Sequence, residues 1–308
     1  MRIGLMLSMP GDPTGVAGLV GRAVAAEKAG FPSTWLPQVS GIDALTLLAL
    51  AGRETSSIEL GTAVVPTYPR HPTVLAGQAL TVQEAAGGRL ALGIGLSHRF
   101  LIEDSLGLDY SQPVPHMREY LTVPHGLLAG ERVSFRGEHY RVNAQVVLAA
   151  PKPPLLVAAL GPAMLRLSGR LSDGTITWMG GLAYLREVAV PALSAAAAAA
   201  GRPAPRVVCM TPVLLAADAP AGRETVNAAF QMYTQVPSYR ATLERGGAER
   251  PADVAIVGSE ADLRAGFAAY AAAGVTDLVA VIPANAGAEG ERTRAFVAEV
   301  SAAGANAA

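Results

Sequence analysis

Few residues of this chain have the types and spacing that catalysis by side chains alone requires. No Gly-x-Ser-x-Gly, His-Glu-x-x-His or P-loop motif is present. The single cysteine, Cys209, lies in the apolar run RVVCMTPVLL, which indicates a buried structural thiol. The five histidines lack metal-ligand spacing: His71, His98, His116, His125 and His139. These patterns disfavour a metal centre and a hydrolase.

His98 is the candidate for proton transfer. It follows the run LALGIGLS, and an unperturbed imidazole titrates near a pH of about 6.5. The stretch GIGLSH begins like a dinucleotide-binding fingerprint but has His98 in place of the third glycine, so it does not predict NAD binding. The alternative role of His98 is a hydrogen bond to a loop carbonyl.

Two glycines in the same run, Gly93 and Gly95, alternate with apolar residues and therefore share one face of a strand. Glycine inside a strand lowers stability by roughly 0.5–1 kcal/mol relative to alanine. It is therefore tolerated best where another group approaches the backbone closely. That group is either a flat aromatic ligand or a tightly packed helix, and the sequence leaves both alternatives open. The preceding apolar run ends in the constrained loop VPTYPRHP, whose last residue, Pro72, predicts the start of a helix.

Two later segments have features of an anion site. AALGPAMLRLSGR enters a helix at Pro162, which leaves backbone N–H groups near Leu160 to Met164 free to face a phosphate. GTITWMGG ends a strand, with Gly180 and Gly181 opening the next loop. Ordinary capping by proline and glycine is the alternative.

The elements that must position these residues alternate between short apolar runs and alanine-rich helical patterns. The runs are typical of parallel strands covered on both faces: Ile3–Ser8, Ser33–Leu36, Ile58–Val65, Leu90–Leu96, Leu155–Ala159, Thr175–Trp178, Val207–Leu214 and Asp277–Ile282. Eight such strands predict a (β/α)8 TIM barrel with insertions, and a doubly wound sheet is the alternative. In a barrel, the functional face is formed by the loops at the C-terminal ends of the strands.

Two stretches interrupt the alternation. Residues 131–150 alternate apolar and polar side chains and predict an inserted strand pair. Residues 215–256 are long for a barrel connection and predict a lid or excursion. Because no repeat or linker is visible, we expect residues 1–308 to form a single domain.

Composition limits the possible partners. The chain has 308 residues, 51% of them hydrophobic, and a net charge of −1, so neither nucleic acid nor an anionic membrane is an expected partner. No signal segment precedes the first strand and no run of about 18 apolar residues is visible. We therefore expect a cytoplasmic protein.

The ordered set of segments resembles the luciferase-like monooxygenase superfamily, in particular its branch of oxidoreductases that depend on coenzyme F420. The resemblance covers most of the chain, and the segments that carry it are AEKAGFPSTWLPQ, LGTAVVPTYPRHPTVLAGQALTVQEAAGGRLALGIGLSHR, MREYL, PPLLVAALGPAMLRLSGRLSDGTI and VGSEADLRAGFAAYAAAGVTDLV. The resemblance implies a (β/α)8 barrel with insertions, FMN or the deazaflavin F420 as cofactor, and a homodimer.

The resemblance also implies site residues. A cis peptide between Ala63 and Val64 would press on the central ring of the cofactor, and Gln38, Gly95 and Ser97 would lie near that ring. The ribityl chain and phosphate would be held by two later segments, which are Ala159, Leu160 and Gly161, and Thr177, Trp178, Met179 and Gly180.

The function expected from this resemblance is hydride transfer between F420 and a small organic substrate, with His98 as proton donor. Some family members have an Asp-His pair where this chain has Pro37 and Gln38. Glutamine forms hydrogen bonds but is no acid or base at neutral pH, which puts a sugar-phosphate dehydrogenase in doubt. The alternatives are an FMN-dependent monooxygenase and, in another class, a non-catalytic ligand-binding barrel.

Overall fold

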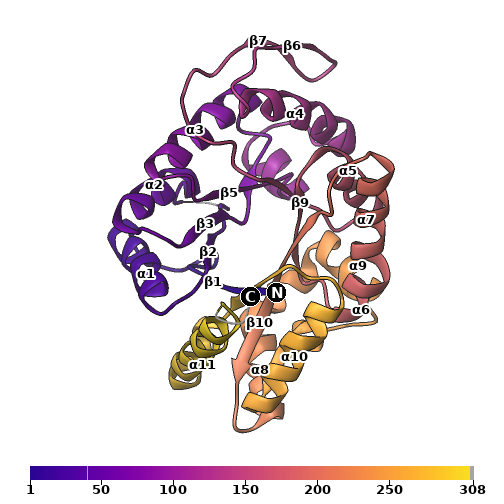
Figure 1. Ribbon diagram of the computed structural model, residues 1–308. Coiled ribbons are helices and arrows are strands. Elements are labelled where there is room, and N and C mark those ends of the chain that lie inside the picture. Colours follow the sequence, from indigo (N-terminus) through magenta and orange to yellow (C-terminus); the bar gives the residue numbers. More distant parts are fainter. Residues whose placement is uncertain (40, 306–308) are drawn as a thin grey trace.

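The computed structural model describes residues 1–39 and 41–305, and its centre is a closed barrel of parallel strands surrounded by helices (Figure 1). The barrel strands are, in order around the barrel, β1 (Arg2–Met6), β2 (Ser33–Leu36), β3 (Glu59–Thr62), β5 (Leu90–Gly95), β8 (Leu155–Ala158), β9 (Gly174–Trp178), β10 (Arg206–Leu215) and β12 (Asp277–Val281). Strand β10 pairs with both β9 and β12, and β12 pairs with β1. The (β/α)8 barrel is therefore confirmed, and the doubly wound sheet is wrong.

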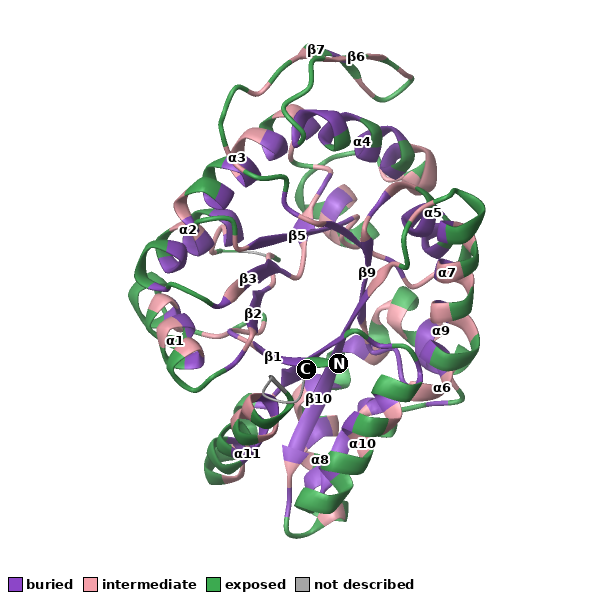
Figure 2. Ribbon diagram, viewed as in Figure 1, coloured by how far each residue is buried: buried purple, intermediate pink, exposed green. Residues whose placement is uncertain are grey.

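The helices cover the outside of the barrel. They are α1 (Val16–Lys28), α2 (Ala44–Glu54), α3 (Pro72–Ala85), α4 (Pro113–Leu127), α5 (Pro162–Leu171), the continuous run α6 (Leu182–Tyr184), η2 (Leu185–Ala189) and α7 (Val190–Ala199), then α10 (Glu260–Ala272) and α11 (Gly287–Ala305). Helix α3 begins at Pro72, as predicted. The barrel strands and the inner faces of these helices are buried, whereas the outer faces are exposed (Figure 2).

The third strand is shorter than predicted. The sequence indicates a strand over Ile58–Val65, but β3 ends at Thr62, and pairing with β5 resumes only at β4 (Val65–Pro66). The Thr62 hydroxyl donates to the Gly93 carbonyl (2.7 Å) and accepts from the Gly93 N–H (2.8 Å). This side chain therefore satisfies backbone groups of β5 while residues 63 and 64 bulge out of the ladder.

Residues 131–150 contain an antiparallel hairpin of β6 (Val133–Arg136) and β7 (Arg141–Ala144), which lies outside the helical layer (Figure 1). The Glu119 carboxylate on α4 accepts hydrogen bonds from three backbone N–H groups of the turn, those of Glu138 (2.9 Å), His139 (2.9 Å) and Tyr140 (3.1 Å). A carboxylate that satisfies three N–H groups fixes the hairpin to α4.

The long segment between β10 and α10 contains ordered elements. They are α8 (Ala219–Phe230), η3 (Gln231–Gln235), α9 (Pro237–Arg245), η4 (Pro251–Val254) and β11 (Ile256–Gly258), which pairs with β10. We call residues 216–255 the excursion. Two further short helices, η1 (Leu101–Ser105) and η5 (Ala284–Ala286), follow β5 and β12.

The N-terminal end of the barrel is closed by charged groups that pair with one another. Arg206 donates to Asp277 (2.8 Å) and Glu59 (2.5 Å), and Arg2 also pairs with Asp277. The Arg206 guanidinium lies 5.5 Å from the ring centroid of Trp35, which fills the barrel interior. We call Arg2, Glu59, Arg206 and Asp277 the basal ion-pair cluster.

The stretch Leu182–Ala199 is long and apolar enough to cross a membrane by length and composition alone. This finding differs from the sequence expectation, which saw no run of about 18 apolar residues. In the structure it is part of the helical layer, and a Cβ added at Gly169 of α5 would lie 2.9 Å from Ala196 Cβ, so the two helices pack closely. Only 33% of the stretch is buried, and much of its apolar character comes from the alanines of α7.

Candidate functional site

A cavity of about 260 Å³ opens at the C-terminal ends of the barrel strands, and we call it the mouth cavity. Its lining residues are Pro37, Gln38, Val39, Ala63, Val64, Pro66, Gly95, Leu96, Ser97, His98, Leu101, Tyr110, Ala158, Leu160, Gly161, Met164, Ser238 and Tyr239. None of them is a lysine, arginine, aspartate or glutamate. The structure thus brings together most of the predicted site residues, namely Gln38, Ala63, Val64, Gly95, Ser97, His98, Leu160 and Gly161.

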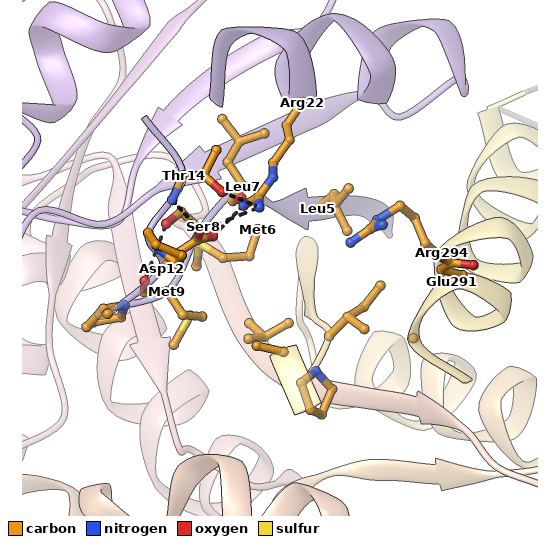
Figure 3. A pocket seen from close by; sticks show the side chains of 18 of the residues that line it. Leu5, Met6, Leu7, Ser8, Met9, Asp12, Thr14, Arg22, Glu291 and Arg294 are labelled. Carbon is orange, nitrogen blue, oxygen red and sulfur yellow. Dashed lines mark hydrogen bonds and ion pairs between the residues drawn. The ribbon is translucent and has the colours of Figure 1, made fainter. Parts of the chain in front are cut away.

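A larger cavity of about 510 Å³ lies beside β1 and β12, between residues 8–14 and the start of α11 (Figure 3). Its charges balance, because Asp12 and Glu291 accompany Arg22 and Arg294. Arg22 is already engaged, since it pairs with Asp12 and donates to the Thr14 hydroxyl (2.7 Å). None of the predicted site residues lines this cavity.

A third cavity of about 330 Å³ connects the other two along the barrel end. It shares residues 8–14 with the larger cavity, and Pro37 and Val39 with the mouth cavity. The mouth cavity is therefore the candidate site, and the adjoining cavities leave room for the rest of a ligand.

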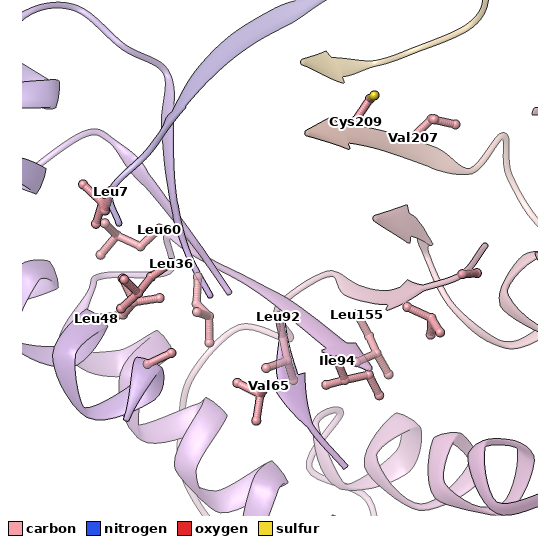
Figure 4. Packing of buried hydrophobic residues seen from close by; sticks show 14 of the residues in the cluster. Leu7, Leu36, Leu48, Leu60, Val65, Leu92, Ile94, Leu155, Val207 and Cys209 are labelled. Atoms are coloured by element: carbon pink, nitrogen blue, oxygen red, sulfur yellow. The ribbon is translucent and has the colours of Figure 1, made fainter. Parts of the chain in front are cut away.

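The glycines of β5 make room for the bulge after β3. The peptide bond between Ala63 and Val64 is cis, as the resemblance implied. A Cβ on Gly95 would lie 2.6 Å from Val64 Cγ2, and one on Gly93 would collide with the Thr62 carbonyl. The close neighbour is therefore the bulge itself, not a helix, and Gly95 also lines the cavity. The alternate residues Leu92 and Ile94 pack outward beside Val65 (Figure 4).

Ser97 has a left-handed backbone conformation. Its φ is 62°, and Met179 (58°) is the other non-glycine residue of the described chain with a positive φ. Such conformations are uncommon without glycine and cluster at functional sites. The Tyr110 hydroxyl donates to the Ser97 carbonyl (3.3 Å), and the Tyr110 ring stacks on Tyr68 (5.1 Å between centroids). These contacts hold Ser97 at the edge of the mouth cavity.

His98 lies in an aromatic environment at the mouth cavity. Its ring is parallel to that of Phe100 (5.8 Å between centroids) and edge-on to that of Tyr239 (5.2 Å). Burial lowers the pKa of His98, because desolvation disfavours the imidazolium. Within the described chain no hydrogen bond to the His98 ring is formed, so its role as a bond to a loop carbonyl is not observed. A neutral imidazole facing the cavity suits proton exchange with a ligand.

Gln38 is held by the start of α2. Its Oε1 accepts from the Ala44 N–H (3.0 Å), and its Nε2 donates to the Asp43 carboxylate (3.4 Å). Asp43 is also the N-cap of α2, accepts from the Thr46 N–H (2.9 Å) and pairs with Arg70. Sequence analysis placed neither Asp43 nor Arg70 beside Gln38. Asp43 lies on the same loop as Gln38, between β2 and α2, but Arg70 comes from the loop after β4.

Leu160 and Gly161 lie where β8 passes into α5. Gly161 is the N-cap of α5, has no side-chain cap, and has open space where a Cβ would be. The first N–H groups of α5 are therefore free to bind an anion at this wall of the mouth cavity. The Tyr184 hydroxyl donates to the Leu160 carbonyl and fixes this loop.

The remaining predicted residues do not line the mouth cavity. Ala159, Thr177 and Met179 are buried in the protein interior. Trp178 packs edge-on against Phe230 (5.4 Å) and its Nε1 is buried without a partner among the described residues. The Gly180 carbonyl accepts a weak contact from the Cys209 thiol (3.9 Å), whose pKa burial raises to about 11. The loop after β9 therefore packs inward beneath the excursion.

Ser238 and Tyr239 were missed by sequence analysis. They come from α9 of the excursion, and Tyr239 contacts Tyr233 (5.2 Å) as well as His98. The sequence signalled only that residues 215–256 are long for a barrel connection. No local motif indicates that this segment folds over His98.

Comparison with known proteins agrees with this geometry. Residues 1–282 match the family described as luciferase-like monooxygenase. The chain is 35% identical over 204 residues, 61% of its length and 60% of the relative, to F420-dependent glucose-6-phosphate dehydrogenase of Nakamurella multipartita.

Two solved structures share the fold. An F420-dependent secondary alcohol dehydrogenase in complex with an F420-acetone adduct has a TM-score of 0.81 with 16% identity, covering 98% of each chain. The oxygenating constituent of 3,6-diketocamphane monooxygenase from Pseudomonas putida, in complex with FMN, has a TM-score of 0.79 with 17% identity, again covering 98% of each. With its barrel, its mouth cavity and the match over residues 1–282, this chain belongs to the luciferase-like monooxygenase family.

Proposed function

We propose that the protein is an F420-dependent oxidoreductase that transfers a hydride between the deazaflavin and a small organic substrate. The observation that carries this proposal is the mouth cavity, which is apolar in part and lined by no charged side chain. Catalysis there needs a group that the side chains do not supply, and a redox cofactor supplies the hydride chemistry when bound. The sequence similarity to an F420-dependent relative supports this choice.

The residues of the mouth cavity fit such a cofactor. Ala63, Val64 and Gly95 form an uncharged wall suited to a planar ring, with Ser97 at its edge. The free N–H groups at the start of α5, behind Gly161, suit a phosphate on the cofactor tail. The protein would thus bind the ring and the tail with different parts of one cavity.

His98 would exchange the proton that accompanies hydride transfer. Its pKa is lowered by burial, so the imidazole is neutral at pH 7. A neutral imidazole accepts a proton when an alcohol is oxidised, and the imidazolium donates one when a carbonyl is reduced. The rings of Phe100 and Tyr239 flank the His98 ring on two sides.

An FMN-dependent monooxygenase is the second candidate, because a structural neighbour binds FMN in the same fold. The two cofactors differ in chemistry, since reduced flavin reacts with oxygen and reduced deazaflavin does so poorly. Similarity at 35% identity to an F420-dependent relative favours F420 over the FMN-bound neighbour at 17%.

Titration of the purified protein with each cofactor tests the proposal. We expect saturable quenching of F420 fluorescence and weaker binding of FMN. Tight FMN binding with no F420 binding would replace the proposal by the monooxygenase. Affinity for neither cofactor would favour the non-catalytic barrel.

We also propose that the protein is cytoplasmic, forms a homodimer and acts on a small molecule, with no nucleic-acid or membrane partner. These proposals rest on the balanced net charge of −1 and on family membership. Light scattering coupled to size-exclusion chromatography tests the dimer: a mass near 31.5 kDa would identify a monomer.

A further inference from the structure

The Gln38 side chain has one amide orientation that its neighbours permit. The Ala44 N–H (3.0 Å) requires an acceptor, and the Asp43 carboxylate (3.4 Å) requires a donor. Turning the amide over would set N–H against N–H and a carbonyl against a carboxylate. Both contacts therefore place Oε1 on Ala44 and Nε2 on Asp43.

This orientation leaves one Nε2 N–H group of Gln38 without a partner among the described residues. Nε2 carries two N–H groups, of which one faces Asp43 and the other is unused among the described residues. Gln38 also lines the mouth cavity, so its side chain belongs to the wall that a bound molecule would contact. A glutamine fixed at both ends loses little side-chain freedom when it donates, which strengthens a hydrogen bond to a ligand.

Asp43 can direct Gln38 because its charge is compensated. Burial opposes ionisation of Asp43, but hydrogen bonds from Thr46, the Arg70 charge and the Gln38 amide together lower its pKa. Arg70 is itself held by Gln78, whose Oε1 accepts from Nε (3.2 Å), and its side chain is only 12% exposed. The constrained loop after β4 thus supplies the cation that keeps Asp43 an acceptor for Gln38.

The mouth cavity determines what that donor meets. Its lining contains amide, hydroxyl and imidazole groups but no ionised carboxylate, lysine or arginine. An anionic group on the reacting part of a substrate would find no counter-charge there. A donor opposite an uncharged wall suits a carbonyl oxygen, on which negative charge develops as a hydride arrives.

We propose that Gln38, positioned by Asp43 and Arg70, donates a hydrogen bond to the reacting oxygen of an uncharged ketone or the matching secondary alcohol. This inference rests on the proposed function. In the reducing direction, bound reduced F420 would supply a hydride to the carbonyl carbon as the C=O π bond breaks, and the oxygen would take a proton from the His98 imidazolium. The ketone would gain two electrons and two hydrogens, the cofactor would lose the two electrons, and His98 would regain its proton from solvent.

The test compares four proteins: the wild type, Gln38→Met, Asp43→Asn and the control Asp218→Asn. Asp218 is the N-cap of α8 and accepts from the Ala221 N–H (3.1 Å), so the control removes a capping charge remote from Gln38. Asparagine also caps helices well, so Asp43→Asn preserves α2 and removes the charged acceptor for Gln38.

Reduction of acetone and cyclohexanone by reduced F420 is measured, with pyruvate as the charged comparison. We expect Gln38→Met to lower kcat/KM for the ketones by about 100-fold with little change in F420 affinity. Asp43→Asn should lower it by about tenfold, and Asp218→Asn should not change it. The proposed substrate class would be overturned if the wild type reduced pyruvate as fast as the ketones. It would also be overturned if the wild type bound F420 but reduced neither ketone.

The positioning role has a readout that does not depend on F420. The side-chain ¹⁵N–¹H₂ signals of Gln38, assigned by their loss in Gln38→Met, should shift in Asp43→Asn and remain unchanged in Asp218→Asn. Unchanged signals in Asp43→Asn would refute the positioning role. A wild type that binds no F420 but shows the shift would overturn the proposed function and leave the positioning by Asp43 established.

Discussion

The two ends of the barrel use polar groups in opposite ways. At the N-terminal end, the basal ion-pair cluster brings Arg206 to two carboxylates, and Asp277 is only 3% exposed. At the C-terminal end, the mouth cavity has no charged lining, and Gln38 and His98 retain capacity for hydrogen bonding. Groups that satisfy one another stabilise a fold, whereas groups left unsatisfied are available to a ligand.

This contrast suggests a division of roles along one set of strands. β3 begins with Glu59 at the closed end and leads into the bulge at Ala63 and Val64 at the open end. β10 likewise begins with Arg206. Substitutions at the closed end should therefore change stability, and those at the mouth should change ligand binding or turnover.

The largest effect is expected for Arg206→Met. It leaves Asp277 buried without its main partner, which costs about 3–5 kcal/mol of unfolding free energy. Urea unfolding measures the loss, and F420 affinity of the folded fraction should stay the same. The matched control is Arg264→Met, whose exposed pair with Glu299 contributes little. Equal losses for the two variants would contradict the assignment of the closed end.

Acid unfolding also tests whether the basal ion-pair cluster stabilises the fold. Burial opposes ionisation of Asp277, but hydrogen bonds and charge from Arg206 outweigh it and lower its pKa. The pKa of Asp277 in the folded state is below the unfolded value of about 3.9. The ionised carboxylate therefore contributes its full stabilisation above about pH 3.9, and this stabilisation is lost as the pH falls through the folded pKa. Stability of Arg206→Met should depend less on pH below about 4 than that of the wild type.

His98→Ala should lower turnover by about 100-fold without a comparable loss of stability. In the wild type, carbonyl reduction should become faster as the pH falls below about 6.5, because the lowered pKa of His98 keeps the imidazole neutral above it. The oxidation direction should show the opposite trend. Unchanged turnover of the variant across pH 5–8 would remove His98 from the mechanism.

Gly95→Ala tests the wall of the mouth cavity. Its Cβ would lie 2.6 Å from Val64 Cγ2, so the valine must shift, at a cost of about 1–3 kcal/mol. F420 affinity should fall with stability, which fluorescence titration and urea unfolding measure together. Gly77→Ala on α3 is the control, since nothing lies within 4 Å of a Cβ there. Wild-type affinity in Gly95→Ala would place the ring elsewhere.

The smallest effect is expected for Tyr239→Ala. Removing this ring opens the edge of His98 to water, so the pKa of His98 should rise toward its ordinary value, because burial is what lowers it. NMR titration of the imidazole measures this change. A pKa that does not move would show that Tyr239 does not shield His98.

The barrel could be predicted from sequence because its strands are short, apolar and bounded by glycine and proline. Pro72 and Pro162, for example, mark the starts of α3 and α5 in both sequence and structure. Residues next to such strand ends, including Ser97, His98 and Leu160, share the mouth cavity because all parallel strands end on the same side. The local sequence pattern was therefore sufficient to predict where these residues lie.

Contacts between segments that are far apart in the chain could not be predicted. Arg70 reaches Asp43 across 27 positions, and Tyr239 reaches His98 from the excursion. No periodicity encodes such pairs. The inward packing of Thr177 to Gly180 was missed for a similar reason. Trp178 is covered by two aromatic residues, Phe230 and Tyr233, which belong to a later segment of the chain.

The excursion lies outside the repeating strand–helix unit, yet it contributes Ser238 and Tyr239 to the mouth cavity. Both residues lie on α9, which is not part of the barrel wall, so exchange of the excursion should leave the strand registers unchanged. We therefore expect a chimera that exchanges residues 216–255 between two family members to change substrate choice while the barrel is retained.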